Sequence, residues 1–524
     1  NVKFCVYIWG NSQYLWYACF DDIGVSVQKE NDIAVTGINI NDIIGIGENE
    51  VSFSVKNNGS NVVTDITAKY QFEGYEEVSQ NFTTNIEPFT GADLTFDVPT
   101  DIQSLDDLTL TVNVTAVNNT TDDNESDNTL EKDLSVAWGT AQRIPMIEHF
   151  SSSSCTPCVS VNASMKTLTN NNPGKYTYVK YSTSWPSPTD THYIPECDVK
   201  AQYYGVSGVP VIMLDGEDRG TPVTQATLDS RFNTPAIADV RGAFNIDGNT
   251  LHVTADFMSY ANMSDVKAFV TVNEKVIEKN GANGESEFRH ILLKMLGGVS
   301  GTDVELKAGE YQRLEFTHDM STTKMQDIND LEVTLWLQNL ETKEVFNSHF
   351  AYEYTDHCYP VQNLRLIEED GNISVTFEAP EQGTPIGYNV YNNGVLIAEN
   401  TTELSHSITV GDMNIIGVVT LYEDGKTSVP VVKLNGAGDG VEETIFAENT
   451  FNIYPNPAKD YVKVSGDDIN TISVYNSLGA LVERIDVEKS TTLIDLSEYN
   501  AGVYFINIEQ NNGVSMTQKM VVTK

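Results

Sequence analysis

Alternating apolar and polar residues run through most of the chain and predict short β-strands. The pattern is clearest in residues 31–137, in stretches such as EVSFSVKNNGS and LTLTVNVTAV, where nearly every second residue is apolar. The same period of two returns in residues 236–356, in GAFNIDGNTLHVTADF and LEVTLWLQNL, and continues in the segments that follow. Turn dipeptides such as Asn393-Gly394 separate the runs. This pattern favours several antiparallel β-sandwiches along the chain.

Residues 141–216 depart from this alternation. There the strand-like RIPMIEHF precedes the helix-like SVNASMKTLTNN, and the strand-like KYTYVKYST precedes the helix-like CDVKAQYYG and then VPVIMLDG. Strand, helix, strand, helix and strand in succession are typical of an α/β unit. We therefore expect a multidomain, mainly β chain with one α/β domain among its sandwiches.

Composition narrows the classes of function. A chain of 524 residues is too long for a single core. Its 74 acidic and 31 basic residues give a formal charge of −43, which disfavours nucleic acid and anionic membrane surfaces as partners. No apolar run approaches the roughly 18 residues of a membrane-spanning helix. The opening NVKFCVYIWG has neither an initiator Met nor signal-peptide features, so we expect a processed or truncated product.

Cys155 and Cys158 stand around Thr156-Pro157, directly after the predicted strand RIPMIEHF. The first turn of a helix offers unpaired N–H groups, which favour a cysteine thiolate. In an active pair Cys155 would be the attacking sulfur and Cys158 the resolving one. Pro157 fits the first turn because its missing N–H costs nothing there. The pair is therefore either a redox site or a staple in a secreted domain.

Further along the chain, Gly208-Val209-Pro210 leads into the strand VIML. Together with the Cys-x-x-Cys after a strand, this segment resembles a thioredoxin-like domain. The resemblance implies a cis-proline at Pro210 that lies against the redox pair and receives an extended substrate chain. Ser154 departs from the family, because thioredoxins usually carry Trp before the first cysteine.

No buried acid stands out as a proton acceptor for this pair. Glu148 is the nearest carboxylate in sequence, and His149 follows it. We interpret His149 as a strand-end histidine, hydrogen-bonded or solvated, in preference to a proton-transfer group. The pairing of the other cysteines stays open: Cys197 is either free or joined to Cys358 or to an N-terminal cysteine, Cys5 or Cys19.

The stretch VKAFVTVNEKVIEKNGANGESEFRHILLKMLGG resembles the β-sandwich half of a family of Bacteroidetes outer-membrane-associated proteins. In that family a thioredoxin-like half with a Cys-x-x-Cys precedes the sandwich. The resemblance covers about residues 141–356 and implies a surface location without a defined chemistry. His290 belongs to the pattern, and we expect it to be a structural histidine on a strand.

Three other segments resemble known β modules. WYACFDDIGV is similar to the last strand of jelly-roll domains, and EVSFSVKNNGS with the acidic DDNESDN resembles adhesion-type immunoglobulin-like modules. CYPVQNLRLIEEDGNISVTFEAP and GYNVYNNG resemble a fibronectin type III domain in which Phe377 replaces the usual core tryptophan. Such modules mostly space domains or bind partners.

The last residues resemble the C-terminal sorting domain of type IX secretion substrates. FNIYPNPAKDYVKVSG, ISVYNSLGALVERI and LIDLSEYNAGVYFINIEQNNGVSMTQKMVVTK carry the parts of that domain in order. The resemblance implies export through the periplasm to the cell surface or medium, an oxidising location, and recognition by the translocon and its outer-membrane shuttle protein. The expected signal residues are Tyr454, Pro455, Asn456, Pro457, Gly502 and Lys519.

The acidic stretch after residue 121 is a weak calcium candidate. Asp122, Asn124 and Ser126 place oxygen side chains at alternate positions, which suits Ca²⁺. The glycine of a twelve-residue calcium loop is absent, so a solvated acidic hairpin is the better interpretation. Asp21-Asp22 is a similar polar pair at a predicted strand end.

These segments predict the following order: the end of a truncated jelly roll (1–29), an immunoglobulin-like sandwich (30–138), a thioredoxin-like domain (139–235), a β-sandwich (236–357), a fibronectin type III-like domain (358–435), a linker (436–450) and the sorting domain (451–524). We favour a secreted or surface modular protein that binds a surface protein or polypeptide. The alternatives are an extracellular thiol–disulfide oxidoreductase or isomerase using Cys155 and Cys158, and a pure adhesin.

Overall fold

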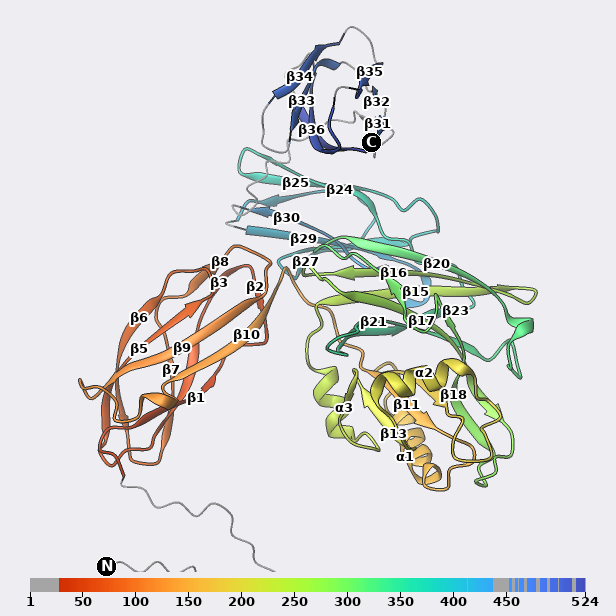
Figure 1. Cartoon of the computed structure of the whole chain (residues 1–524), viewed down its shortest axis with the longest axis horizontal. Helices are drawn as coiled ribbons and strands as arrows, with labels where there is room; N and C mark the ends of the chain where they lie inside the picture. Colours follow the sequence, from red (N-terminus) through yellow and green to blue (C-terminus); the bar gives the residue numbers. More distant parts are fainter. Residues whose placement is uncertain are drawn as a thin grey trace, which may run out of the picture. The chain divides into compact units, whose positions relative to one another are not determined.

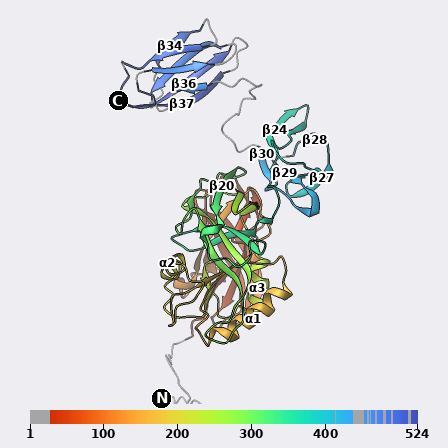
Figure 2. The same cartoon turned by 90° about the vertical axis from the view of Figure 1, so that its right-hand side faces the viewer.

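The structure is a computed structural model that describes residues 28–411, 413–436, 452–454, 458–459, 461–465, 469–476, 481–487, 491–497, 499–510 and 515–523. The chain divides into two compact units, residues 1–436 and 437–524 (Figures 1 and 2). Strands dominate both units and form several sheets, so the chain is mainly β. Within the ranges above, no helix is long and apolar enough to cross a membrane.

The first sandwich fits the alternating pattern of its sequence. Sheets ordered β1-β4-β7 and β2-β10-β9-β5-β6 enclose one core, in which Phe96 packs against the rings of Phe53 and Tyr70. Strand β9 buries Leu110 and Val112, with the polar Thr111 between them. The elements are β1 (Ile33–Ile38), β2 (Ile43–Gly45), β3 (Gly47–Asn49), β4 (Ser52–Asn57), β5 (Val63–Phe72), β6 (Val78–Ile86), β7 (Gly91–Thr95), β8 (Thr100–Ile102), β9 (Leu108–Val117), η1 (Glu125–Asp127) and β10 (Thr129–Ala137).

The next segment has helices on both faces of a mixed sheet (Figure 1). Strand β11 (Met146–Ser151) runs parallel to β12 (Thr177–Ser182) and antiparallel to β13 (Val211–Leu214). Every residue of β11 and β12 is buried, as expected for central strands covered on both sides. Helices α1 (Cys158–Asn171) and α3 (Gln225–Phe232) pack on the face of Ile147, and α2 (Pro195–Tyr204) packs on the face of Phe150.

This sheet does not stop at the predicted boundary at residue 235. Strand β12 also pairs in parallel with β18, where Lys180 meets Ile291, and the sheet continues in the order β14-β13-β11-β12-β18-β17-β21-β22. A second sheet, β20-β16-β15-β23, packs against this extension around a core that includes Phe244 and Leu335. One sheet therefore contains strands from both sides of the predicted boundary. The division into domains 139–235 and 236–357 stays a prediction.

The elements of this extended part are β14 (Glu217–Asp218), β15 (Ala238–Asp247), β16 (Thr250–Ser259), β17 (Val266–Glu278), β18 (Glu287–Leu296), β19 (Thr302–Asp303), β20 (Tyr311–Asp319), η2 (Met320–Thr322), β21 (Leu331–Asn339), β22 (Val345–Phe350) and β23 (Tyr352–Glu353).

A smaller sandwich completes the first unit. Its sheets are β24-β25-β28 and β27-β26-β29-β30, and Phe377 is buried in their core against Tyr388, with ring centroids 5.1 Å apart. Phe377 thus fills a core position, as the sequence predicts. The elements are β24 (Gln362–Glu369), β25 (Asn372–Glu378), β26 (Gly387–Asn392), β27 (Val395–Thr401), β28 (Ser405–Thr409), β29 (Met413–Leu421), η3 (Glu423–Gly425) and β30 (Val431–Gly436).

The second unit is a separate small sandwich. Sheets β31-β32-β35 and β34-β33-β36-β37 enclose a core that contains Val462, Ile472, Ile506 and Met520. The elements are β31 (Asn452–Tyr454), β32 (Tyr461–Ser465), β33 (Ile469–Asn476), β34 (Leu481–Asp486), β35 (Thr491–Asp495), β36 (Gly502–Gln510) and β37 (Ser515–Val522).

Candidate functional site

Cys155 and Cys158 form a disulfide at the start of α1. Strand β11 ends at Ser151, a short turn follows, and Cys158 is the first residue of the helix. The backbone N–H of Cys158 points at Cys155 Sγ at 3.1 Å. This is the favourable contact between a helix N-terminus and sulfur that the sequence predicts.

The loop before β13 lies against the same sulfur. The Val209–Pro210 peptide is cis, and the carbonyl oxygen of Val209 is 3.5 Å from Cys155 Sγ. The structure therefore brings Cys155, Cys158 and Pro210 together, as the sequence predicts. A catalytic role for these residues stays a prediction.

The disulfide is closed off from solvent. Cys155 is 2% exposed and Cys158 is 0% exposed, although Thr156 and Pro157 between them are exposed. On one side the hydroxyl of Ser154 donates to the carbonyl of Pro188. An external thiolate cannot reach either sulfur without a local opening of this packing.

A hairpin from the extended part of the sheet covers another side. We call residues 279–286, which connect β17 and β18, the strap. The backbone N–H of Asn283 donates to the carbonyl of Ser153 at 2.9 Å, and its side-chain Nδ2 donates to the carbonyl of Cys155 at 3.2 Å. Gly281 allows this approach, because a Cβ there would lie 3.0 Å from the Ser153 carbonyl oxygen. The strap thus holds the turn that carries Cys155.

A polar chain leads from the strap into the interior. Glu285 accepts hydrogen bonds from Asn162 Nδ2 at 2.9 and 3.0 Å, and from Asn283 Nδ2 at 2.6 Å. Asn162, one helical turn after Cys158, accepts in turn from Lys180 Nζ at 3.1 Å. The strap, the first turns of α1 and Lys180 are therefore one hydrogen-bonded network.

Lys180 and His149 lie side by side beneath α1. They are register partners on β12 and β11, and both are buried. Burial lowers the pKa of Lys180 to about 8, although the Glu285 carboxylate opposes this shift. Burial also holds the pKa of His149 well below its usual range, and Lys180 adds to that effect. His149 Nδ1 bonds the hydroxyl of Tyr178 at 2.6 Å, so this histidine is hydrogen-bonded in the core and not solvated.

The sequence does not reveal the role of Glu148. It is fully buried, and it faces α2 because adjacent strand residues point to opposite sides. Lys200 Nζ is 3.0 Å from its Oε1, and the Tyr181 hydroxyl donates to the same oxygen at 2.7 Å. The Lys200 ammonium also lies 4.9 Å from the ring centre of Phe269. Glu148 is thus committed to a buried ion pair on the face away from His149.

Among the described residues, the other cysteines and His290 have no place beside the disulfide. Cys197 and Cys358 are buried free thiols, and burial raises their pKa values to about 12 and about 11. Cys5 and Cys19 lie outside the described residues, as does Asp21-Asp22. His290 Nδ1 is 2.7 Å from Glu332 Oε1, and its ring stacks on Tyr178, which fits the expected structural role.

The calcium candidates hold a turn. Asp122 accepts the backbone N–H of Ile33 at 2.8 Å and that of Asn124 at 2.6 Å, and the hydroxyl of Ser126 donates to Asn124 Oδ1 at 2.8 Å. In the part of the chain that the structure describes, no group of three or more His, Cys, Asp or Glu side chains stands ready to hold a metal ion.

Of the expected sorting residues, Tyr454 ends β31, Gly502 begins β36 and Lys519 lies in β37. Pro455, Asn456 and Pro457 lie outside the described residues. Residues 452–523 match the family model of the secretion system C-terminal sorting domain. This segment is a secretion sorting domain. It indicates export by the type IX system to the cell surface or the extracellular space.

Comparison of the whole chain with known proteins gives partial likenesses. Beta-agarase A of Zobellia galactanivorans is 25% identical over 245 residues, which cover 44% of this chain and 44% of the relative, so the chain spans less than half of that relative's length. The structure of HBP35 of Porphyromonas gingivalis covers 74% of this chain and 100% of its own, at 14% identity and a TM-score of 0.34. The central fibronectin-III array of RIM-binding protein covers 53% of this chain and 94% of its own, at 9% identity and a TM-score of 0.18.

Proposed function

We propose that this chain is an exported, modular binding protein of the cell surface, in which a thioredoxin-like domain carries a fixed disulfide. The sorting domain supports export, and the series of sandwiches supports a spacing and binding role. The observation that supports a fixed disulfide is the burial of both sulfurs, with Cys155 only 2% exposed. A redox enzyme needs one sulfur that its substrate can reach.

The cover over the disulfide supports the same proposal. Val209, Pro188 and Asn283 belong to separate segments, and each approaches Cys155 or the turn that leads to it. Because the opening of one segment leaves the contacts of the others in place, thiol–disulfide exchange at Cys155 requires these segments to move together. The ligand in this proposal is a surface protein or an extended polypeptide, held by the modules around the closed pair.

The runner-up is an extracellular thiol–disulfide oxidoreductase or isomerase. It is favoured by the placement of Cys155 and Cys158 at a helix N-terminus beside Pro210, and by the buried base Lys180 on the same side of the sheet. Such an enzyme also needs an external redox partner that returns the cysteine pair to its starting oxidation state after each turnover.

The test is turnover by the full chain. We expect insulin reduction and refolding of scrambled ribonuclease to proceed at the same rate with the parent, with the Cys155→Ser variant and without protein. Folding of the variant is verified by its melting temperature. A parental rate clearly above that of Cys155→Ser would overturn the fixed-disulfide proposal in favour of the oxidoreductase.

A further inference from the structure

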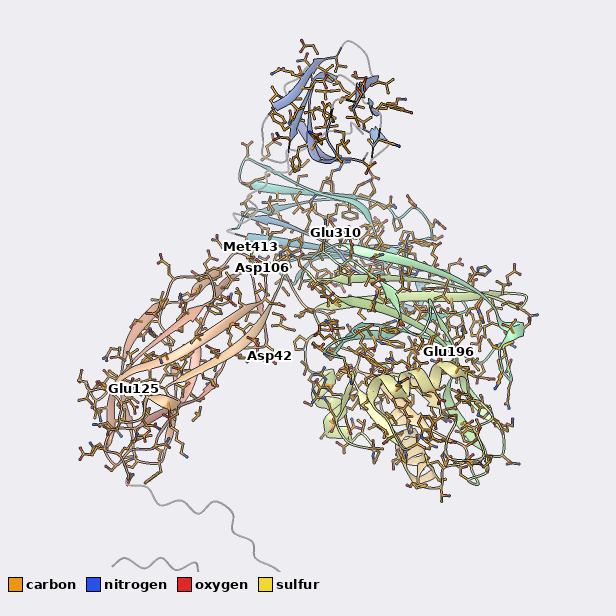
Figure 3. The ribbon with its side chains drawn as sticks, viewed as in Figure 1. Asp42, Asp106, Glu125, Glu196, Glu310 and Met413 are labelled. Carbon is orange, nitrogen blue, oxygen red and sulfur yellow. A yellow bond between two sulfur atoms is a disulfide. The ribbon has the colours of Figure 1, made fainter. Side chains whose placement is uncertain are left out.

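A hollow of about 250 Å³ lies where the β15–β16 hairpin meets the smaller sandwich. It is lined by residues of β15 and β16, by the segment 355–359 and by Gln382-Gly383 in the loop between β25 and β26. In Figure 3 the label Glu310 marks the residue before β20, the neighbour of β16 in this sheet. Ligand sites are common at such junctions between modules.

One wall of the hollow is a buried histidine whose second ring nitrogen has no partner. His357 lines the hollow and is 5% exposed. Its Nε2 is 2.7 Å from Oδ2 of Asp256, and Arg313 donates to both carboxylate oxygens of Asp256 at 2.8 and 3.0 Å. His357 Nδ1 is buried without a hydrogen-bond partner among the described residues. Such an atom calls for a partner, because leaving it unpaired costs free energy.

The chemistry of this nitrogen points to a hydroxyl group. Because the Asp256 carboxylate accepts the proton on Nε2, a neutral His357 presents Nδ1 as an acceptor. A protonated His357 would present Nδ1 as a donor instead. A hydroxyl group both donates and accepts, so it is a partner for either state of the ring.

The rest of the lining offers donors and acceptors around the same space. Asn245 and His252 are register partners on β15 and β16, and Thr254 lies two residues along β16 on the same face. Gln382 adds an amide group from the smaller sandwich. Asn245 Nδ2 donates to Asp356 Oδ1 at 3.4 Å, a long bond that leaves the amide oxygen and its second N–H for a ligand.

We propose that this hollow binds one ring of a neutral saccharide, with a sugar hydroxyl bonded to His357 Nδ1. A sugar ring carries several hydroxyl groups and an apolar C–H face, which fit the polar groups of the lining and the ring of Tyr359. The hollow is smaller than the roughly 300–1,000 Å³ of sites for drug-sized ligands, so it takes a single ring. The exposed carboxylate of Asp356 at the rim disfavours acidic sugars.

This inference goes beyond the proposed function, because it adds a second class of ligand at a different place. The hollow shares no residue with the disulfide or its cover, so the turnover test of Cys155 does not bear on it.

The experiment is calorimetric titration of the full chain with neutral glucose-, mannose- and galactose-based hexasaccharides. We expect saturable binding of at least one of them. His357→Phe and Asn245→Ala each weaken that binding about five- to tenfold, because each removes a hydrogen-bond partner of the sugar. Asn249→Ala is the matched control and keeps the parental affinity, because Asn249 is exposed in the same hairpin and does not line the hollow.

A second readout separates this site from binding elsewhere on the surface. In saturation-transfer NMR we expect the bound sugar to receive magnetisation from the parent and from Asn249→Ala, and less from His357→Phe. The proposal is overturned if no hexasaccharide binds, or if both His357→Phe and Asn245→Ala keep the parental affinity. It is also overturned if the peptide Gly-Ser-Thr-Ser-Gly binds in a His357-dependent way and the sugars do not, because the hydroxyl would then come from a protein. If His357→Phe does not fold, Asn245→Ala and Thr254→Val decide.

Discussion

At the scale of single residues, Lys180 shows how burial and hydrogen bonding compete. Its ammonium is buried beside His149 and has the amide oxygen of Asn162 as a hydrogen-bond acceptor. The effect of burial is larger than that of the hydrogen bond, because the pKa of Lys180 falls to about 8 from an ordinary value of 10.5. The folded protein therefore releases this proton at a lower pH than the unfolded chain does.

That difference predicts a pH-dependent effect of Lys180→Met. Between about pH 8 and pH 10 the unfolded chain binds more protons at this position, so the unfolding free energy of the parent rises with pH relative to the variant. Below pH 8 the cost of burying the charge is fully present. We expect the stability of Lys180→Met minus that of the parent, from urea unfolding, to be constant from pH 6 to 7 and to fall through pH 8–10.

A difference that stays constant up to pH 10 would show that Lys180 keeps its proton in the fold. It would also remove Lys180 as a candidate base in the oxidoreductase alternative.

Asn283 is the residue that ties the strap to the disulfide. Asn283→Ala loses the side-chain bonds to the Cys155 carbonyl at 3.2 Å and to Glu285 at 2.6 Å. Each such bond contributes about 1 kcal/mol net, so the loss of both makes local opening about thirtyfold more frequent. We expect reduction of Cys155–Cys158 by dithiothreitol, followed by alkylation and mass spectrometry, to accelerate about thirtyfold.

Asn280→Ala is the matched control, since Asn280 is an exposed asparagine of the same strap. We expect it to react at the parental rate. Equal rates for the Asn283 and Asn280 variants would mean that the strap does not limit access to the sulfurs.

At the scale of elements, the sheet that residues 139–235 and 236–357 share determines which fragments can fold alone. Strand β12 pairs with β18 across the predicted boundary, and α2 packs into a core that includes Phe269 and Trp336. A fragment of residues 139–235 would expose that edge and that core. We expect residues 139–357 to melt cooperatively by circular dichroism, and residues 139–235 alone not to do so.

Cooperative melting of residues 139–235 by themselves would show that the sequence boundary is also a folding boundary. It would further imply that the strap is an added cover and not part of the folding unit.

The sequence predicts the local parts of the candidate site and misses the distant ones. Cys155, Cys158 and Pro210 can be recognised in the sequence because they belong to short motifs at predicted strand ends. These motifs are a Cys-x-x-Cys after one strand and a Gly-Val-Pro before another. Asn283 carries no such signal, since its role depends on a hairpin that folds back from β17.

At the scale of the whole molecule, the two features that bear on function are the sorting domain and the buried disulfide. The chain forms two compact units, and the second holds the sorting domain, so the signal for export is separate from the unit that carries Cys155. The net charge of −43 suits an exported protein in contact with salt and divalent cations. In the proposed function, the oxidising medium outside the cell keeps the pair joined.

The reduction potential of Cys155–Cys158 in the full chain tests this account most directly. The protein is equilibrated in dithiothreitol and glutathione buffers, and the oxidised fraction is read by alkylation and mass spectrometry. A buried structural disulfide predicts a potential below about −300 mV, with no reduction by glutathione. A potential of about −200 mV or higher, the range of exchange catalysts, would contradict the fixed-disulfide account.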